Sequence, residues 1–502
     1  MSHGHSSIDI VAPRSKFYQG PFGRLFPELP AWAPEGKHEH ELPSHFLEIA
    51  NQEMVEAPGK SPLDIAGDPA LIQELETKFS SKIPAGYTYF GQFIDHDITF
   101  DPASSLMRRN DPSGLLNHRT PRLDLDNVYG SGPEANPHLY QKDDPEKFLI
   151  DEVQGTKLAD LPRNREGRAL IGDPRNDENV MVSQLQLAFL LAHNTLVDRA
   201  REVKPEGAFE RARTTLRWLY QYISWNDFVF RIANNKVHGC ALKLDKTCDG
   251  RRSWSLGLED IYSWKHQPFM PVEFAVAAYR FGHSLVRNSY QTNGPVRGFG
   301  NFAPIFDNSG TPSPDDLRGF RPMEARNYIQ WDWFLQMTSS EGPFPQLGRK
   351  IDTKLSNALG NLPIGPVGAR MNVLAFRNLQ RGWTFGLPSG SDVARKLCLE
   401  PIDIPQDHDA LWFYILKEAE TLPGGNGGQM LGRVGSVIVC STFAGLLLGD
   451  PHSYFNVEPC WTPDDDSLLM EDDKVDAGDW TLASIIRLSG LPVGAGDFDG
   501  KI

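Results

Sequence analysis

Residues 87–101, which read YTYFGQFIDHDITFD, place an amide, an imidazole and carboxylates among aromatic and aliphatic side chains. We expect one helix here, on which Gln92 and His96 share a face because they are four residues apart, with Asp95 and Asp97 beside that face. Buried polar groups cost stability unless they are satisfied. The segment is therefore either an exposed helix with ordinary charges or a helix whose polar side chains serve a site.

Helical periodicity dominates the chain after Pro69, as in residues 69–79 and 180–203, whereas strand-like alternation is scarce and short. The longest apolar run, residues 434–448, is interrupted by Gly and Ser, and its about 15 residues fall short of the roughly 20 that a membrane span needs. We therefore predict a buried helix there, no membrane span, and a mainly α fold with few short strands.

Residues 1–80 are predicted to form an extended N-terminal arm that packs on the core, because prolines at positions 13, 21, 27, 30 and 34 interrupt any long element. A chain of 502 residues suggests roughly two to four domains. We nevertheless predict one large catalytic domain over residues 81–495, because motifs far apart in the chain contribute to one site.

The formal net charge of −15 argues against nucleic acids or anionic membranes as partners. The five cysteines contain no CxxC pair, which excludes a disulfide-rich scaffold and a zinc ribbon and leaves a single Cys240–Cys248 bridge open. The N-terminal residues lack the basic and apolar regions of a secretory signal. We therefore expect a cytoplasmic protein, or one that is secreted without a cleaved signal.

Oxygen-bearing side chains gather in residues 119–131, RTPRLDLDNVYGS, where Asp124, Asp126 and Asn127 lie close together in sequence. Clustered oxygen donors are what Ca²⁺ prefers. An EF-hand is excluded, because the loop counted from Asp124 has Tyr129 at its sixth position, where that motif needs Gly. Taken alone, the segment is better explained as an Asp/Asn turn that caps a helix.

Three further segments carry charged or imidazole side chains. Arg175 and Glu178 lie three residues apart in GDPRNDEN, a pair that is usually solvated when it stands alone. His283 ends the string RFGH after several alanines, which favour a helix, and a lone histidine there is more often part of the core than a ligand. Asn378 and Arg381 lie in RNLQRGWTFGLP.

Together these five segments resemble, in the same order, the motifs of the animal-type haem peroxidases, the peroxidase–cyclooxygenase superfamily that includes myeloperoxidase and lactoperoxidase. Five motifs in the family's order leave little room for chance. The resemblance implies a single, mainly α haem-peroxidase domain with haem b and Ca²⁺ as cofactors.

On the distal side of the haem, the resemblance assigns catalytic roles to His96, Arg175 and Gln92. His96 would act as a base and then as an acid on peroxide. Arg175 would stabilise negative charge on the leaving oxygen. Gln92 would position a water or a halide through its amide.

The resemblance also predicts covalent attachment of the haem. Asp95 and Glu178 occupy the two positions that form ester bonds with haem methyl groups. Asn179 stands where the myeloperoxidase branch has the methionine of a third, sulfonium link, and Asn cannot make that bond. Two ester bonds at most are therefore expected.

On the proximal side, the resemblance assigns His283 to the haem iron. Arg280 and Arg381 would pair with the haem propionates. Asn378 would accept a hydrogen bond from the imidazole of His283, which fixes the tautomer and basicity of an iron ligand. The residues after Arg381 depart from the more polar family sequence, which puts the outer pocket in question.

The same resemblance maps calcium ligands onto the segment 119–131 and the distal helix. The side chain and carbonyl of Thr120, the carbonyl of Arg122, and the carboxylates of Asp97, Asp124 and Asp126 would bind the ion. Because Asp97 follows His96, the ion would fix the position of that histidine.

These assignments imply an enzyme that reduces hydrogen peroxide and oxidises small organic donors or halides through a ferryl haem. One alternative is a haem dioxygenase of the cyclooxygenase or fatty-acid dioxygenase type, whose tyrosine stands three residues before the proximal histidine. Arg280 holds that position here, and Tyr279 would point some 100° away on a helix. The other alternative is a non-enzymatic, calcium-stabilised haem-binding protein, which would be expected to have lost His96 or Arg175.

Overall fold

The computed structural model describes residues 22–57, 59–60, 62–100, 117–246, 252–264, 268–306, 313–337, 344–363, 369–421, 427–475 and 478–502. Cys248, and with it the Cys240–Cys248 bridge, lies outside these residues. The α-helices are α1 (Leu42–Glu53), α2 (Pro62–Ala66), α3 (Pro69–Phe79), α4 (Gly86–Ile98), α5 (Asp126–Tyr129), α6 (Val180–Val203), α7 (Ala208–Ile223), α8 (Phe230–Ile232), α9 (Asn235–Ala241), α10 (Asn357–Gly360), α11 (Leu374–Thr384), α12 (Gly390–Lys396), α13 (Leu411–Thr421), α14 (Arg433–Gly449), α15 (Tyr454–Val457) and α16 (Leu482–Ser489).

The strands of the described residues are short and form five separate pairs. Four pairs are antiparallel, namely β2 with β10, β3 with β4, β5 with β6 and β8 with β9, and β1 pairs with β7 in parallel. The mainly α fold with few short strands is thereby confirmed. The strands are β1 (Phe22–Gly23), β2 (Ser80–Pro84), β3 (Asp151–Glu152), β4 (Ala159–Asp160), β5 (Leu242–Lys246), β6 (Arg252–Leu256), β7 (Met270–Pro271), β8 (Ser289–Tyr290), β9 (Ala303–Pro304) and β10 (Leu347–Arg349).

Local sequence signals account for several helix ends. Helix α3 begins after Asp68, whose side chain accepts hydrogen bonds from two backbone N–H groups of the first turn, with Pro69 at the first helical position. Helix α6 begins after Asn179, whose side chain accepts from the N–H of Val182. Helices α3 and α6 have the predicted bounds, and the apolar run at 434–448 forms α14, which is mostly buried.

Helix α6 is the one helix among the described residues that is long and apolar enough to cross a membrane by length and composition. Of its most apolar 18-residue window, 83% is buried inside the fold. A core helix of a folded protein has this same character, so α6 is weak evidence for a membrane span.

Much of the predicted N-terminal arm is helical rather than extended. Helix α1 buries Leu42, Phe46 and Ile49 in the main hydrophobic core, and the proline near its start is compatible with a first helical turn. Helices α2 and α3 form a small cluster of their own around Ile65 and Ile72. Residues 22–41 contain no helix, whereas Pro43, Pro62 and Pro69 stand at helix starts, and the division of the chain at residue 80 stays a prediction.

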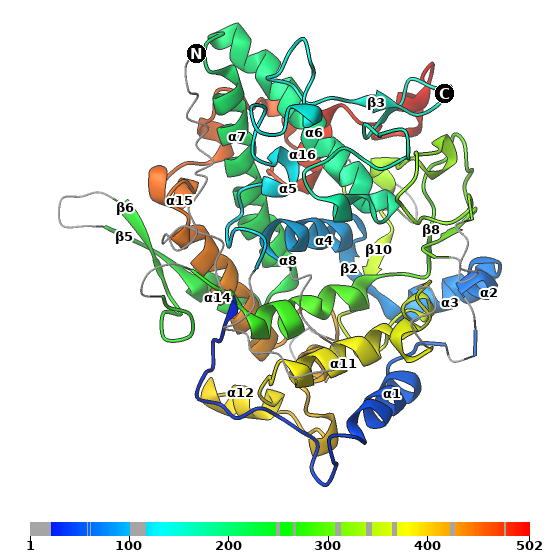
Figure 1. Cartoon of the computed structure of the whole chain (residues 1–502), viewed down its shortest axis with the longest axis vertical. Helices are drawn as coiled ribbons and strands as arrows, with labels where there is room; N and C mark the ends of the chain where they lie inside the picture. Colours follow the sequence, from blue (N-terminus) through cyan, green and yellow to red (C-terminus); the bar gives the residue numbers. More distant parts are fainter. Residues whose placement is uncertain are drawn as a thin grey trace.

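Helix α4 lies near the centre of the molecule, with α6 and α7 on one side and α11 and α14 on the other (Figure 1). Phe93 of α4 stacks on Phe189 of α6 with ring centroids 4.5 Å apart. Gly86 starts the helix, and a Cβ there would come within 2.6 Å of the Leu335 side chain. The distal segment predicted from the sequence is thus one buried helix, and its polar side chains face other protein groups rather than bulk water.

The alanine-rich segment before His283 is helical but not α-helical. A wide π-helical turn, η5 (Glu273–Ala277), passes directly into a tight 3₁₀ helix, η6 (Ala278–Leu285). The buried carboxylate of Glu273 accepts hydrogen bonds from the N–H groups of Leu25 and Phe26. This change of helical pitch alters which side chains share a face, because a 3₁₀ helix turns by about 120° per residue.

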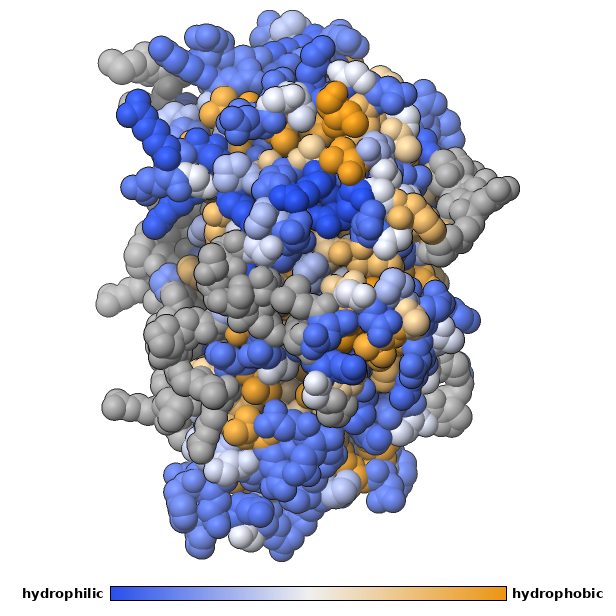
Figure 2. All heavy atoms as spheres, turned by 90° about the vertical axis from the view of Figure 1, so that its right-hand side faces the viewer, coloured by the Kyte–Doolittle hydropathy of each residue, from blue (hydrophilic) through white to orange (hydrophobic). Residues whose placement is uncertain are grey.

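Hydrophobic residues on the face shown in Figure 2 lie in separate small groups among hydrophilic ones. Scattered exposed apolar side chains are normal for a folded protein. This face therefore does not present the single large apolar patch that marks a protein–protein or membrane interface.

Two ion pairs, one buried and one partly buried, join the N-terminal helices to the rest of the fold. Glu56, just after α1, pairs with Arg349 of β10, and Glu76 of α3 pairs with Arg287, four residues after His283. The side chains of Glu56 and Arg349 are 0% and 5% exposed. Breaking such a pair leaves a buried charge without compensation.

We predict that Glu56→Ala lowers the free energy of unfolding by roughly 3–5 kcal/mol, because Arg349 loses its only carboxylate partner among the described residues. Urea unfolding measures the change. Glu28→Ala is the matched control, since Glu28 and Lys396 form an exposed pair and such pairs contribute less than about 1 kcal/mol. Equal losses for the two variants would contradict the prediction.

Candidate functional site

A cavity of about 450 Å³ lies against α4. Helix α4 contributes Gln92, Asp95 and His96 to its lining, and the segment before α6 contributes Glu178 and Asn179. Helix η6 supplies Arg280 and His283, and helix α11 supplies Arg377. The lining also includes Tyr279, Leu285, Ile305, Phe306, Leu359 and Leu374. The two histidines that the sequence analysis singled out therefore border one cavity.

Two amides orient the ring of His96. Its Nδ1 lies 2.7 Å from Asn176 Oδ1, and Asn176 Nδ2 donates to Gln186 Oε1 at 2.7 Å. Because Gln186 uses the amide nitrogen of Asn176, the amide oxygen accepts from Nδ1–H of His96. The lone pair of the imidazole is then on Nε2, which lies 3.8 Å from Glu178 Oε1. This tautomer presents a basic nitrogen to the cavity.

The amide of Gln92 is engaged at both ends. Its Nε2 donates to Glu178 Oε1, and its Oε1 accepts from Asn179 Nδ2 at 3.0 Å. Asn179 thus caps α6 and holds Gln92 at the same time. The amide keeps a second N–H and a second lone pair, and its role in positioning a water or a halide stays a prediction.

Both carboxylates at the predicted ester positions line the cavity. Asp95 Oδ1 accepts from Thr99 Oγ1 at 2.9 Å, one turn further along α4. Burial raises the pKa of Glu178, and the charges of His96 and Arg175 act in the opposite direction. Each carboxylate has one neutral hydrogen-bond donor, and both remain open to a group in the cavity.

Arg175 does not line the cavity. Its Nη2 donates to the backbone carbonyl of His96 at 2.9 Å and to Asp173 Oδ2 at 2.8 Å, and its guanidinium lies 4.6 Å from the ring centre of Phe100. Burial raises the pKa of Asp173, but the bonds and charges of Arg175 and Arg119 outweigh it and lower that pKa to about 2. Two charge-assisted bonds therefore hold Arg175 outside the cavity, where it supports the end of α4.

His283 is held by Asn378 of α11, whose Nδ2 lies 2.9 Å from His283 Nδ1. The amide oxygen of Asn378 instead accepts from Arg280 Nη1 at 3.0 Å. This orientation is the reverse of the predicted one, because Arg280 competes for the oxygen. Rotation of the amide by 180° gives His283 its acceptor. Burial, together with the charges of Arg280 and Arg377, lowers the pKa of His283 to about 3, so the ring is neutral.

Of the two arginines that the resemblance assigns to the propionates, Arg280 is at the cavity and Arg381 is not. Arg381 does not line the cavity, and its guanidinium lies 5.5 Å from the ring centre of Phe385. Arg377, one turn earlier on α11, lines the cavity instead. Arg280 lines it as predicted, with Nε bonded to the carbonyl of Ala275 at 3.1 Å.

Tyr279 also lines the cavity, contrary to the expectation that it points away. Its hydroxyl donates to the carbonyl of Gly91 on α4 at 3.1 Å. Residues 279–283 all line the cavity, so the cavity borders more than one face of η6. Tyr279 and Arg280 consequently both reach the cavity wall.

Three carboxylates gather where the calcium site is predicted. Asp97, Asp124 and Asp126 each offer an oxygen within 4.8 Å of the others. Asp97 is fully buried, its Oδ2 accepts from the N–H of Leu125 and from the Tyr220 hydroxyl, and its Oδ1 has no hydrogen-bond partner among the described residues. Burial and mutual repulsion raise the pKa of Asp97.

The predicted neighbours of this cluster are in place. Thr120 Oγ1 donates to Asp124 Oδ2 at 2.8 Å. Burial raises the pKa of Asp124, and the guanidinium of Arg122 opposes that rise, which places Arg122 beside the cluster. Leu125 adopts the left-handed conformation with φ of 61°, which costs roughly 1–3 kcal/mol and aims its N–H at Asp97.

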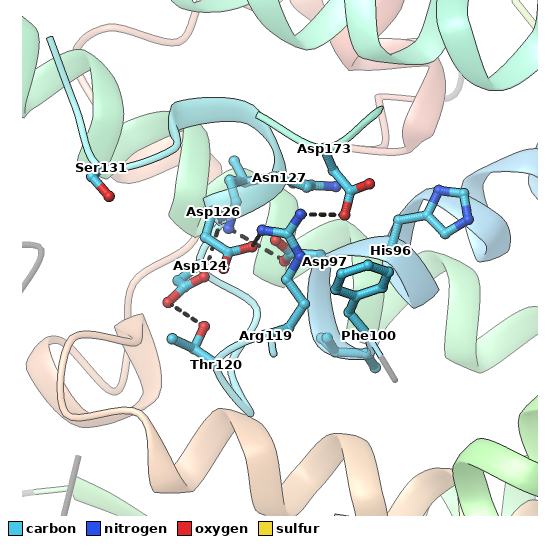
Figure 3. Close-up of polar contacts among 12 residues, drawn as sticks. His96, Asp97, Phe100, Arg119, Thr120, Asp124, Asp126, Asn127, Ser131 and Asp173 are labelled. Atoms are coloured by element: carbon cyan, nitrogen blue, oxygen red, sulfur yellow. Dashed lines mark hydrogen bonds and ion pairs between the residues drawn. The ribbon is translucent and has the colours of Figure 1, made fainter. Parts of the chain in front are cut away.

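Arg119 joins the carboxylate cluster to the distal segment (Figure 3). Its Nη1 donates to Asp126 Oδ1 at 3.1 Å, and its Nη2 donates to Asp173. Asp173 in turn holds Arg175. One chain of ion pairs therefore runs from the three carboxylates to the backbone of His96.

These residues fit the cofactors that the resemblance implies. The cavity has the volume of a small-molecule site, one imidazole whose Nδ1 is bonded to an amide oxygen, and a second imidazole held by an amide. Gly282 leaves open space, since a Cβ there would meet nothing within 4 Å. The carboxylate cluster, with the unpartnered Oδ1 of Asp97, fits a hard divalent cation.

Sequence reasoning missed several residues of this site. Asn176 and Gln186 orient His96, and Asp173 holds Arg175. Arg119 supplies a positive charge at the carboxylate cluster, and Arg377 supplies one at the cavity wall. Asn176 and Asp173 lie within the motif GDPRNDEN, so their closeness to Arg175 was a usable signal. Arg377 directly precedes Asn378. Helical periodicity alone does not tell whether Arg377 or Arg381 faces the cavity, because positions 377 and 381 share a face.

The family model for animal haem peroxidases matches residues 103–408, more than half of the chain. The chain belongs to the animal haem peroxidase family. Among curated relatives, the chorion peroxidase of Drosophila melanogaster is 25% identical over 365 residues, which is 66% of this chain and 41% of that protein. A peroxidase-like protein of Margaritifera margaritifera is 33% identical over 129 residues, 25% of this chain and 15% of that protein. The chain thus spans less than half the length of these relatives.

Two solved structures share the fold of this chain. Peroxidase A of Dictyostelium discoideum superposes with a TM-score of 0.62 at 16% identity, over 96% of this chain and 95% of that one. A fatty acid alpha-dioxygenase of Oryza sativa superposes with a TM-score of 0.53 at 15% identity, over 93% of this chain and 79% of that one. At these identities the likeness establishes the architecture and leaves the reaction open between the two kinds of enzyme.

Proposed function

We propose that this member of the animal haem peroxidase family reduces hydrogen peroxide and oxidises small organic donors or halides, with haem b as its prosthetic group. The observation that carries the proposal is that His96, with Nε2 as its basic nitrogen, borders the same cavity as the neutral His283. A non-enzymatic haem-binding protein has no need for a distal base whose tautomer is fixed by two successive amides.

The residues around the cavity would share the work as follows. His283 and Arg280 would hold the cofactor, and haem supplies redox chemistry that amino-acid side chains lack. His96 Nε2 would take the proton of hydrogen peroxide and return it to the oxygen that leaves as water. Asn176 would keep Nε2 available by accepting from Nδ1–H throughout. Arg175, bound to the His96 carbonyl, would hold the histidine in place.

A fatty-acid dioxygenase is the second candidate function. Tyr279 favours it, because this phenol lies at the cavity wall and not on the opposite face of the helix. The test uses purified protein with a Soret band. Peroxide-dependent oxidation of phenols or iodide supports the peroxidase. Oxygen uptake with palmitate that is lost in Tyr279→Phe, without peroxide-dependent turnover, would overturn it.

The proposed base gives a direct prediction. His96→Ala should keep the Soret band but slow the reaction with hydrogen peroxide by roughly 10²–10⁴-fold. Asn176→Ala should slow it less, because it frees the tautomer that carries the proton on Nε2. Stopped-flow absorbance measures both rates, and His138→Ala, an exposed histidine away from the cavity, is the matched control. If His96→Ala reacts with hydrogen peroxide at the wild-type rate, the assignment of His96 as the base is wrong.

We further propose that Asp97, Thr120, the Arg122 carbonyl, Asp124 and Asp126 bind calcium. Asp97→Ala and Asp124→Ala should each lower bound calcium, thermal stability and activity, because the ion links α4 to the segment that begins at Thr120. Elemental analysis and thermal unfolding measure these changes, with Asp198→Ala as an exposed carboxylate control. Active protein that contains no calcium after chelation contradicts the proposal.

Covalent attachment is the third prediction of this function. After peroxide treatment, haem should remain bound to the denatured wild-type chain through Asp95 and Glu178, and the double variant Asp95→Ala, Glu178→Ala should release it. Denaturing mass spectrometry reads the mass of each chain directly. The matched control is Asp151→Ala, Glu152→Ala, which removes two exposed carboxylates. Complete release of haem from the wild type would refute the ester bonds.

A further inference from the structure

Arg377 on α11 is a cation at the cavity wall that no carboxylate of the described residues neutralises. It is partly buried and lines the cavity. No hydrogen bond or ion pair joins its guanidinium to any of the described residues. Arg377 directly precedes Asn378, whose amide contacts the imidazole of His283, so it lies on the proximal side of the cavity.

The other charged groups of the cavity are engaged elsewhere. Arg280 donates to the carbonyl of Ala275 and to Asn378. The two carboxylates at the wall, Asp95 and Glu178, belong to the distal side, where they accept from Thr99 and Gln92. Within the part of the chain that the structure describes, the proximal half of the cavity therefore presents the cation of Arg377 without a carboxylate.

A guanidinium that is removed from water without an anionic partner is costly, and a bidentate carboxylate is its preferred partner. Arg381, the arginine that the family motif would supply, lies against Phe385 outside the cavity. We propose that Arg377 binds a propionate carboxylate of the haem in place of Arg381. This inference rests on the proposed function in one respect, namely that the cavity takes haem.

A carboxylate at Arg377 could also come from a fatty-acid substrate. The position of Arg377 favours the cofactor. It directly precedes Asn378, which contacts the ring of His283, whereas a substrate that reacts at the distal side meets His96 and Glu178. The propionate assignment also explains how Arg381 can turn toward Phe385 without loss of the anion site.

The test compares full-length wild type, Arg377→Met, Arg377→Lys and Arg381→Met, each loaded with haem b and kept from peroxide so that no covalent bond forms. Transfer of haem to excess apomyoglobin gives the rate of haem loss. Resonance Raman spectra of the same proteins give the propionate bending band, which responds to hydrogen bonding of the carboxylate. A third measurement is the Kd of palmitate for each haem-loaded protein.

Haem loss from Arg377→Met should be roughly ten- to hundredfold faster than from wild type, since a hydrogen bond to a charged group is worth one to two powers of ten. Its propionate band should shift. Arg377→Lys should show a smaller increase and a different band position, and Arg381→Met should match wild type in both.

A haem-loss rate in Arg377→Met equal to wild type, or an effect confined to Arg381→Met, overturns the proposal. So does a change in palmitate Kd alone, which would assign Arg377 to a substrate carboxylate. If Arg377→Met does not fold, an unshifted propionate band in Arg377→Lys overturns it equally. Failure of the wild type to bind haem at all would instead remove the proposed function.

Discussion

The hydrogen bonds between the end of α4 and residues 173–179 set the geometry of the whole site. The Arg175 guanidinium binds the His96 carbonyl, and the Asn176 amide binds the His96 ring. Backbone and side chain of one residue are therefore fixed by two neighbours in sequence. Since Glu178 and Asn179 hold Gln92 from the same short segment, two polar residues of α4 are positioned by residues 175–179.

Charge balance extends this arrangement to the carboxylate cluster. Asp173 is shared by Arg119 and Arg175, and Arg119 also neutralises part of Asp126. Such a network is favourable only when every member keeps a partner, because its groups are largely buried. A change at the cluster is therefore transmitted to the residues that hold α4 through contacts that are all electrostatic.

Sequence reasoning identified the elements and the chemically distinct residues better than their orientation. Asp68 and Asn179 are strong helix caps, so α3 and α6 could be bounded from local chemistry alone. The cavity brings together His96 and His283, which spacing and resemblance had already marked. The placement of Arg175, Arg381 and Tyr279 could not be predicted. It depends on competition from Asp173, on contact with Phe385 and on a cavity that borders several consecutive residues of η6, all of which are tertiary effects.

Helices α2 and α3 share a hydrophobic cluster that is separate from the main core, and this has a consequence for motion. A unit with its own small core can open by itself at a lower free energy than the whole molecule, as local unfolding in native-state hydrogen exchange shows for other proteins. Glu76 of α3, however, is the partner of the buried Arg287, which lies one helical turn beyond His283. Each local opening of α3 would leave Arg287 without its carboxylate partner. The stability of the unit formed by α2 and α3 is therefore coupled electrostatically to the segment that carries His283.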